Sequence, residues 1–201
     1  MVMRTPFGGG IKGGHYHSQS PESLFIHTPG LKVIAPSNPY DAKGLLLASI
    51  ADPDPVIFFE PKRVYRASVN DVPEEQYTLP LGKANIVRPG KDLTVVAWGA
   101  MVHEAQKAVD EAAEEGVDCE LIDLRSLLPW DAETVIESVK KTGRCVVVYE
   151  APRTLGFGTE IISQIMEDAF DYLEAPVSRV TGYDTPFPYT LEHDYLPLAH
   201  R

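Results

Sequence analysis

The chain has 201 residues and carries 18 basic against 29 acidic side chains, a formal charge of -11. This charge repels phosphate backbones and anionic lipid surfaces, so nucleic acid and membrane are poor partners. No apolar run approaches the roughly 18 residues that span a bilayer. Cys119 and Cys145 lie in apolar, strand-like runs, where free thiols usually pack as small hydrophobes. We therefore expect no disulfide and a reducing, cytoplasmic setting.

The first 60 residues alternate between strand-like and helix-like segments, and proline or glycine marks the boundaries. In chain order, the pattern predicts a strand at residues 1–5, a glycine-rich loop at 8–14, a helix at 22–27, a strand at 32–35, a helix at 41–51 and a strand at 56–60. Residues 61–85 are polar and contain prolines, as a connecting segment does. We predict one domain at residues 1–75, linker included, and a second at 76–201.

The second domain shows the same alternation more strongly. The sequence predicts strands at residues 94–97, 120–124, 145–149 and 177–180, with helices at 102–115, 132–140 and 158–173. Strands separated by helices imply crossover connections and a mainly parallel sheet, so the predicted fold class is α/β. Gly116 is expected to end its helix. The tail, residues 182–201, is rich in proline and aromatic residues and should pack onto a surface of this chain or of another subunit.

The glycine-rich loop is the most informative stretch of the sequence. It has five glycines within seven positions and is followed at once by His15, His17, Ser18 and Gln19. Glycines let a backbone pass close to another group, and imidazole transfers protons near neutral pH. From these residues alone, histidines that make local hydrogen bonds or bind nothing are the favoured interpretation. Ser20 and Pro21 are expected to begin the next helix, with Ser20 as its cap.

Several ordered blocks of the sequence resemble one known family. They are GGHYHSQSPESLFIHTPGLKVIAPSNPYDAKGLL, IFFEPKRVYR, LTVVAWGAMVHEA, LIDLRSLLPWD, KTGRCVVVYEAP and GYDTPFPY. Together they resemble the beta subunit of the decarboxylating component of thiamine-diphosphate-dependent 2-oxoacid dehydrogenases, over essentially the whole chain. The resemblance implies a partial pyrimidine-binding-type domain followed by a transketolase C-terminal-like domain.

The same resemblance implies a function and a site. The second histidine of the YHSQSPE block, His17 here, would lie at the mouth of the thiamine diphosphate channel and serve acyl transfer to lipoyl-lysine. His15 is a weaker candidate. The implied substrate is a branched-chain 2-oxoacid, with pyruvate as the alternative. The implied partners are an alpha subunit, a second beta subunit in an α2β2 heterotetramer, and a lipoyl-bearing acyltransferase core.

The resemblance also implies metal ions. Potassium would lie at the stretch that contains Ser49, Asp52 and Asp54, where oxygen ligands suit such an ion. The alternative there is a solvated turn capped by Asp52. Magnesium and the diphosphate would be held by the alpha subunit. Family beta subunits also carry, upstream, a glutamate that activates the cofactor and has no match here, so we expect the isolated chain to be inactive.

Other features are interpreted as structural. Gly156 and Gly158 precede a helix, but a lone Gly-x-Gly is a weak phosphate signal. Glu60 and Glu150 end strands and should anchor local structure, and Arg125 should form a buried or interfacial salt bridge. His27, His103, His193 and His200 lack neighbours at metal-ligand spacing. A non-catalytic docking module, whose acidic second domain binds a basic partner segment, remains the rival hypothesis, ahead of a free-standing nucleotide-binding domain.

Overall fold

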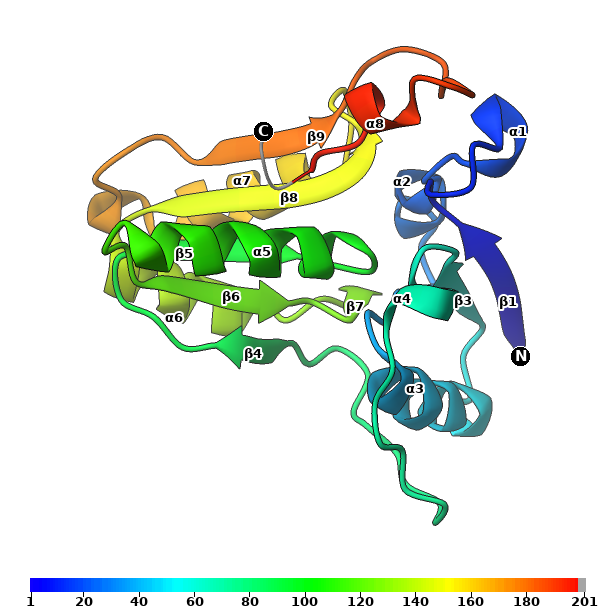
Figure 1. Cartoon of the computed structure of the whole chain (residues 1–201). Helices are drawn as coiled ribbons and strands as arrows, with labels where there is room; N and C mark the ends of the chain where they lie inside the picture. Colours follow the sequence, from blue (N-terminus) through cyan, green and yellow to red (C-terminus); the bar gives the residue numbers. More distant parts are fainter. Residues whose placement is uncertain (199–201) are drawn as a thin grey trace.

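The computed structural model describes residues 1–198, which form two sheets joined by a long connection (Figure 1). The predicted alternation of the first part is confirmed, with two short helices in addition. Its elements are β1 (Val2–Phe7), α1 (Gly14–His17), α2 (Glu22–Ile26), β2 (Lys32–Ile34), α3 (Pro39–Ala51), β3 (Val56–Pro61) and α4 (Val64–Ala67).

The second part begins after the irregular connection and contains every predicted strand and helix. Its elements are β4 (Asn85–Arg88), β5 (Leu93–Ala97), α5 (Met101–Glu114), β6 (Cys119–Asp123), β7 (Ser126–Leu128), α6 (Ala132–Thr142), β8 (Cys145–Pro152), α7 (Gly158–Asp168), the 3-10 turn η1 (Phe170–Tyr172), β9 (Ser178–Gly182) and α8 (Glu192–Tyr195).

Both sheets are mainly parallel, which confirms the α/β fold class. The smaller sheet has the order β1-β3-β2-β7 and the larger one β4-β6-β5-β8-β9. Only β2 with β7 and β4 with β6 pair antiparallel within residues 1–198. In the larger sheet, α5 covers one face, while α6 and α7 cover the other (Figure 1). This is the layered arrangement that crossover connections produce.

Strand β7 connects the two sheets. It follows β6 of the larger sheet in the sequence but pairs with β2 of the smaller one, where Val33 lies opposite Leu128 and Ile34 opposite Ser126. The predicted division into residues 1–75 and 76–201 therefore has a strand of the second range inside the first sheet. That division stays a prediction, and its last three residues lie outside the described part of the chain.

The main hydrophobic core is shared by the two sheets. Phe7, Val33 and Phe59 of the smaller sheet pack in one cluster with Tyr149 of the larger sheet and with Trp98, which directly follows β5. Burying large side chains of this kind stabilises a fold by about 1.5–3 kcal/mol each. Cys119 and Cys145 are buried free thiols, which confirms their predicted role as core residues. No helix within residues 1–198 is long and apolar enough to cross a membrane.

Local signals explain most helix boundaries. The Asn38 side chain caps α3 by accepting from the Asp41 N–H at 2.9 Å, and Asp131 caps α6 through Thr134 at 3.3 Å. Gly116 follows α5 with a φ of 89°, and Gly143 follows α6 with a φ of 69°. These left-handed positions favour glycine. The predicted cap at Gly116 is confirmed.

Two predictions about helix ends were wrong. Pro21, not Ser20, is the N-cap of α2, and it makes no side-chain cap bond. The Ser20 side chain is instead buried beneath the glycine-rich loop, beside Glu150. Helix α7 ends at Asp168 rather than at residue 173, because the chain passes from Ala169 into the tighter turn η1. Apolar periodicity does not separate these two helical forms.

Candidate functional site

His17 lies at the end of the short helix α1, on the surface of the molecule. Its side chain is exposed to solvent, and α1 lies beside the part of the tail that leads into α8, at one end of the fold (Figure 1). A catalytic histidine must be accessible to its substrate, so a position in the hydrophobic interior would contradict a catalytic role for His17. The exposure is compatible with the predicted role of His17, which stays a prediction.

Glycine conformations shape the loop that leads to His17. Gly8, Gly10 and Gly14 have φ values of 80°, 93° and 60°, a region that other residues rarely adopt. The loop is closed at its base by the Gly8 N–H, which donates to the Gln19 carbonyl at 2.9 Å. The Gly13 N–H donates to Ser18 Oγ at 3.0 Å, directly beside His17. The glycines are therefore required by the backbone path.

His15, the weaker candidate, has a different environment. Its exposed ring lies 4.1 Å from the Tyr16 ring and 6.2 Å from the Tyr189 ring, measured between centroids. Its backbone carbonyl accepts a hydrogen bond from Gln19. These contacts fit a residue that supports the loop.

Two buried carboxylates lie beneath the loop. Glu150 Oε2 accepts from the Gly9 N–H at 3.3 Å, and Glu22 Oε1 accepts from the Trp98 indole at 3.1 Å. Burial raises the pKa of Glu22 to about 7, with a smaller contribution from the Glu150 charge, and burial also raises the pKa of Glu150. Glu150 was expected to anchor local structure, and its bond to Gly9 confirms this. The sequence did not single out Glu22 or Trp98.

The tail packs onto this chain's own glycine-rich loop. The Lys12 N–H donates to Glu192 Oε2 at 2.9 Å. A Cβ atom at Gly9 would come within 2.7 Å of the Phe187 ring, and one at Gly14 within 2.3 Å of the Tyr189 ring. Of the two surfaces that the sequence left open for the tail, the structure shows the one within the chain. The loop thus lies between the tail and the buried carboxylates.

A second polar cluster lies where β6 passes into β7. Asp123 is fully buried, accepts from Ser37 Oγ at 2.5 Å, and has its pKa raised to about 7 by burial. Arg125 Nε lies 3.2 Å from Asp41 Oδ2, and both side chains are largely buried. The predicted buried salt bridge of Arg125 is confirmed. The cluster joins the two sheets, which indicates a structural role.

The predicted potassium ligands are engaged in other contacts. Ser49 Oγ donates to the Leu45 carbonyl within α3 at 2.7 Å. The Lys32 ammonium lies 2.6 Å from Asp52 and 3.1 Å from Asp54, and it lowers the pKa of Asp52. An added cation would be repelled by Lys32, so the donor set fits a lysine better than potassium. In residues 1–198 no group of three or more His, Cys, Asp and Glu side chains is arranged around a metal position.

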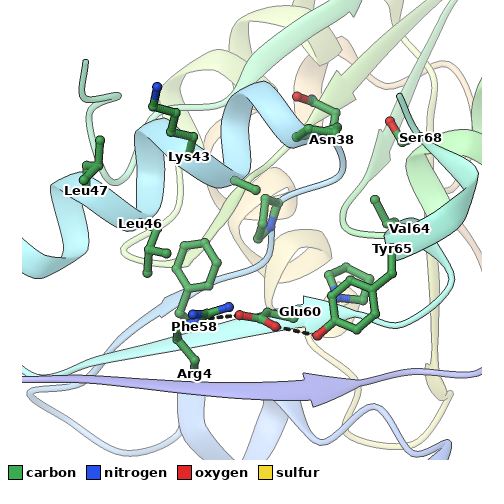
Figure 2. A pocket seen from close by; sticks show the side chains of 14 residues that line it. Arg4, Asn38, Lys43, Leu46, Leu47, Phe58, Glu60, Val64, Tyr65 and Ser68 are labelled. Atoms are coloured by element: carbon green, nitrogen blue, oxygen red, sulfur yellow. Dashed lines mark hydrogen bonds and ion pairs between the residues drawn. The ribbon is translucent and has the colours of Figure 1, made fainter. Parts of the chain in front are cut away.

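A cavity of about 490 Å³ opens beside α3 and β3, and His17 does not line it. Its walls include Leu46, Phe58 and Val64. At its floor Glu60 bonds to both Arg4 and Tyr65 (Figure 2). These bonds confirm that Glu60 anchors local structure. The mainly apolar walls suit contact with apolar side chains, and the sequence did not predict the cavity.

The Gly-x-Gly at Gly156 and Gly158 accommodates an aromatic ring. A Cβ atom at either glycine would come within 2.5 Å of Tyr149, whose ring stacks on Trp98 at 5.2 Å. The space beside these glycines is therefore filled by protein, which confirms their interpretation as a turn into a helix.

Comparisons with known proteins agree with this architecture. The family model "Transketolase, pyrimidine binding domain" matches residues 1–68, and "Transketolase, C-terminal domain" matches residues 82–201. A solved structure titled "Split gene transketolase, inactive beta4 tetramer" has a TM-score of 0.81 at 24% identity. The match covers 99% of this chain and 62% of the chain in that structure. At this identity it shows the fold alone.

The curated relatives are more similar in sequence. The 2-oxoisovalerate dehydrogenase subunit beta is 59% identical in Dictyostelium discoideum and 53% in Pseudomonas aeruginosa, over 98% of this chain and 54% and 60% of theirs. The pyruvate dehydrogenase E1 component subunit beta of Acholeplasma laidlawii is 52% identical over 100% of this chain and 62% of its own.

These names confirm the resemblance to 2-oxoacid dehydrogenase beta subunits, although the chain spans only about half to three-fifths of the length of these relatives. The chain belongs to the transketolase C-terminal domain family, with a pyrimidine binding domain of the same enzyme class in front of it.

Proposed function

We propose that this chain is part of the beta subunit of a 2-oxoacid dehydrogenase decarboxylating component, with His17 as its catalytic contribution. The observation that carries the proposal is the solvent-exposed His17 at the end of a loop that is fixed from two sides. The beta-subunit relatives support it over nearly the whole chain.

The proposed chemistry assigns one task to His17. Thiamine diphosphate, when bound, stabilises the negative charge that loss of CO2 leaves on the acyl carbon. The acyl group then passes to a lipoyl disulfide, and opening of that disulfide leaves a sulfur atom that needs a proton. The His17 imidazole, exposed beside the loop, would donate this proton and recover it from solvent. The cofactor's diphosphate and magnesium are proposed to be held by the alpha subunit.

Branched-chain 2-oxoacids are the proposed substrates. The relatives named for 2-oxoisovalerate reach 59% identity, whereas the pyruvate enzyme reaches 52%. Steady-state turnover of the assembled enzyme on 2-oxoisovalerate and on pyruvate tests this directly. A higher kcat/KM for pyruvate would reverse the assignment.

The proposed partners are an alpha subunit and a second beta subunit in an α2β2 assembly, located in the cytoplasm. Strand β1 supports this proposal because, among residues 1–198, it pairs with β3 on one side only and leaves Met3 42% exposed. Unpaired apolar edges are usually covered in a native protein. The apolar cavity beside α3 gives a second surface for such cover.

The decisive experiment replaces His17 by alanine in the α2β2 assembly, with His27→Ala, an exposed histidine directly after α2, as the control. Acyl transfer to a lipoyl domain should fall by about 10²–10⁴-fold in the first variant only, which is the usual contribution of a general acid. Size-exclusion chromatography should show unchanged assembly. Equal transfer by both variants would refute the catalytic role.

A docking role is the second candidate. Asp110, Glu111, Glu114 and Glu115 are exposed along the end of α5, on a chain of charge -11. This acidic surface suits a basic segment of the lipoyl-bearing acyltransferase core. Salt-sensitive binding of that segment, lost when these four residues are neutralised while His17 variants bind normally, would support docking as a separate function.

A further inference from the structure

The tail contacts the glycine-rich loop at several successive positions. Phe187 and Leu196 lie against Gly9, Tyr189 lies against Gly14, and Glu192 accepts the Lys12 N–H. The tail is itself held to the turn that follows β8, since Asp184 accepts from the Thr154 N–H at 2.8 Å and from Thr154 Oγ1 at 2.7 Å. A series of contacts therefore runs from the second domain to the loop that carries His17.

Lys12 shows why the loop needs this support. It has a φ of 54°, which side chains with a Cβ atom adopt only when other contacts compensate the strain. The Lys12 N–H donates a hydrogen bond to the Glu192 carboxylate. Glu192 is 3% exposed, so water competes little for this charge-assisted bond. The contact holds the loop in a conformation that its sequence alone does not favour.

A basic side chain, Lys62, lies near the Glu192 carboxylate and favours its negative charge. Lys62 is partly buried with Glu150 and Glu192 as its acidic neighbours. Burial lowers the pKa of Lys62, while both carboxylates favour its charged form. The Lys62 charge is thus favoured by the acid beneath the loop and by the acid beside it.

We propose that the tail is a positioning element for His17, with Glu192 as its principal residue and Tyr189 as its second contact. Glu192 acts through the Lys12 backbone and does not touch substrate. The role of the positioned histidine rests on the proposed function, whereas the tail's control of the loop conformation is independent of it.

The first experiment measures amide hydrogen exchange in the 201-residue chain. Glu192→Ala should speed exchange of the Lys12 amide by about tenfold or more, because a buried bond to a charged acceptor is lost. Glu192→Gln keeps an acceptor oxygen and should restore most of the protection. Glu167→Ala, an exposed glutamate on α7, is the matched control. Unchanged exchange at Lys12 in Glu192→Ala would overturn the proposal.

A second measurement separates positioning from general stability. In the α2β2 assembly, Glu192→Ala should lower kcat for acyl transfer by about tenfold with little change in the KM for the 2-oxoacid, since misplacement of a catalytic group reduces the rate of the chemical step. Glu192→Gln should recover most of the rate. A parallel loss of Tm, assembly and KM would show a merely structural role and refute positioning.

The two proposals fail in different ways. If His17→Ala transfers acyl groups normally, the proposed function falls while the exchange result at Lys12 stands. If His17→Ala is inactive but Glu192→Ala is fully active, the function stands and the positioning role falls. Tyr189→Ala provides an independent variant, for which we expect faster exchange at Gly14 and neighbouring amides.

Discussion

Trp98 donates its indole N–H to the buried carboxylate of Glu22 across the boundary between the two sheets, at 3.1 Å. Glu22 belongs to α2, and Trp98 follows β5. Because both side chains are almost fully buried, the bond is sheltered from water and specifies how the two parts of the chain meet.

Trp98→Phe should therefore lower the free energy of unfolding by about 1–3 kcal/mol, since it leaves a buried acceptor without its donor. Urea denaturation at constant pH measures the loss. Trp130→Phe changes the same residue type at a half-buried position and should cost less. Equal losses in the two variants would contradict the importance of this bond.

Glu22 makes stability depend on pH. Its pKa of about 7 in the folded chain lies above its ordinary value near 4.5, so the folded state retains a proton that the unfolded state loses. The stabilisation is complete below pH 4.5 and is lost as pH rises through 7. Glu22→Gln keeps an acceptor for Trp98 and should gain up to about 3 kcal/mol over wild type at pH 8. Unfolding curves at pH 5 and pH 8 test this, and an equal gain at both would contradict it.

Gly8 and Gly30 give a matched pair for the glycine-rich loop. Both have positive φ, 80° and 90°, but a Cβ at Gly8 would lie 2.2 Å from Glu150 Oε1, whereas one at Gly30 meets nothing. Gly30→Ala should cost about 1 kcal/mol from the backbone alone. Gly8→Ala should cost about 2–4 kcal/mol because the clash is added. Thermal or chemical denaturation measures both, and similar costs would show that Glu150 moves away freely.

Arg125 should contribute far more to the free energy of unfolding than an exposed arginine does. Its partner Asp41 is 4% exposed, and the neutral side chain of Arg125→Met would leave that carboxylate buried without its ion-pair partner, at a cost of about 3–5 kcal/mol. Arg144 pairs with Glu174 in solvent, and Arg144→Met should cost under about 1 kcal/mol. A small effect at both positions would mean that water reaches Asp41.

Local patterns in the sequence predicted most elements, because apolar periodicity and turn residues act over short distances. Residues 102–115 read as an amphipathic helix, and α5 spans Met101–Glu114. Strand β7 was missed because it has three residues and its partner Val33 lies far away in sequence. The resemblance pointed to His17, but the bonds of Glu22, Glu150 and Glu192 join residues more than 70 positions apart, and no local pattern encodes them.

The short strand β7 also bears on how the molecule would respond to a break in its chain. Residues 69–84 form no helix or strand, so a protease that cuts this connection removes little structure. The two fragments would still share a sheet through the pairing of Val33 with Leu128 and of Ile34 with Ser126. Under native conditions we expect such a nicked protein to migrate as one particle, and to separate only when denaturant dissolves that shared sheet.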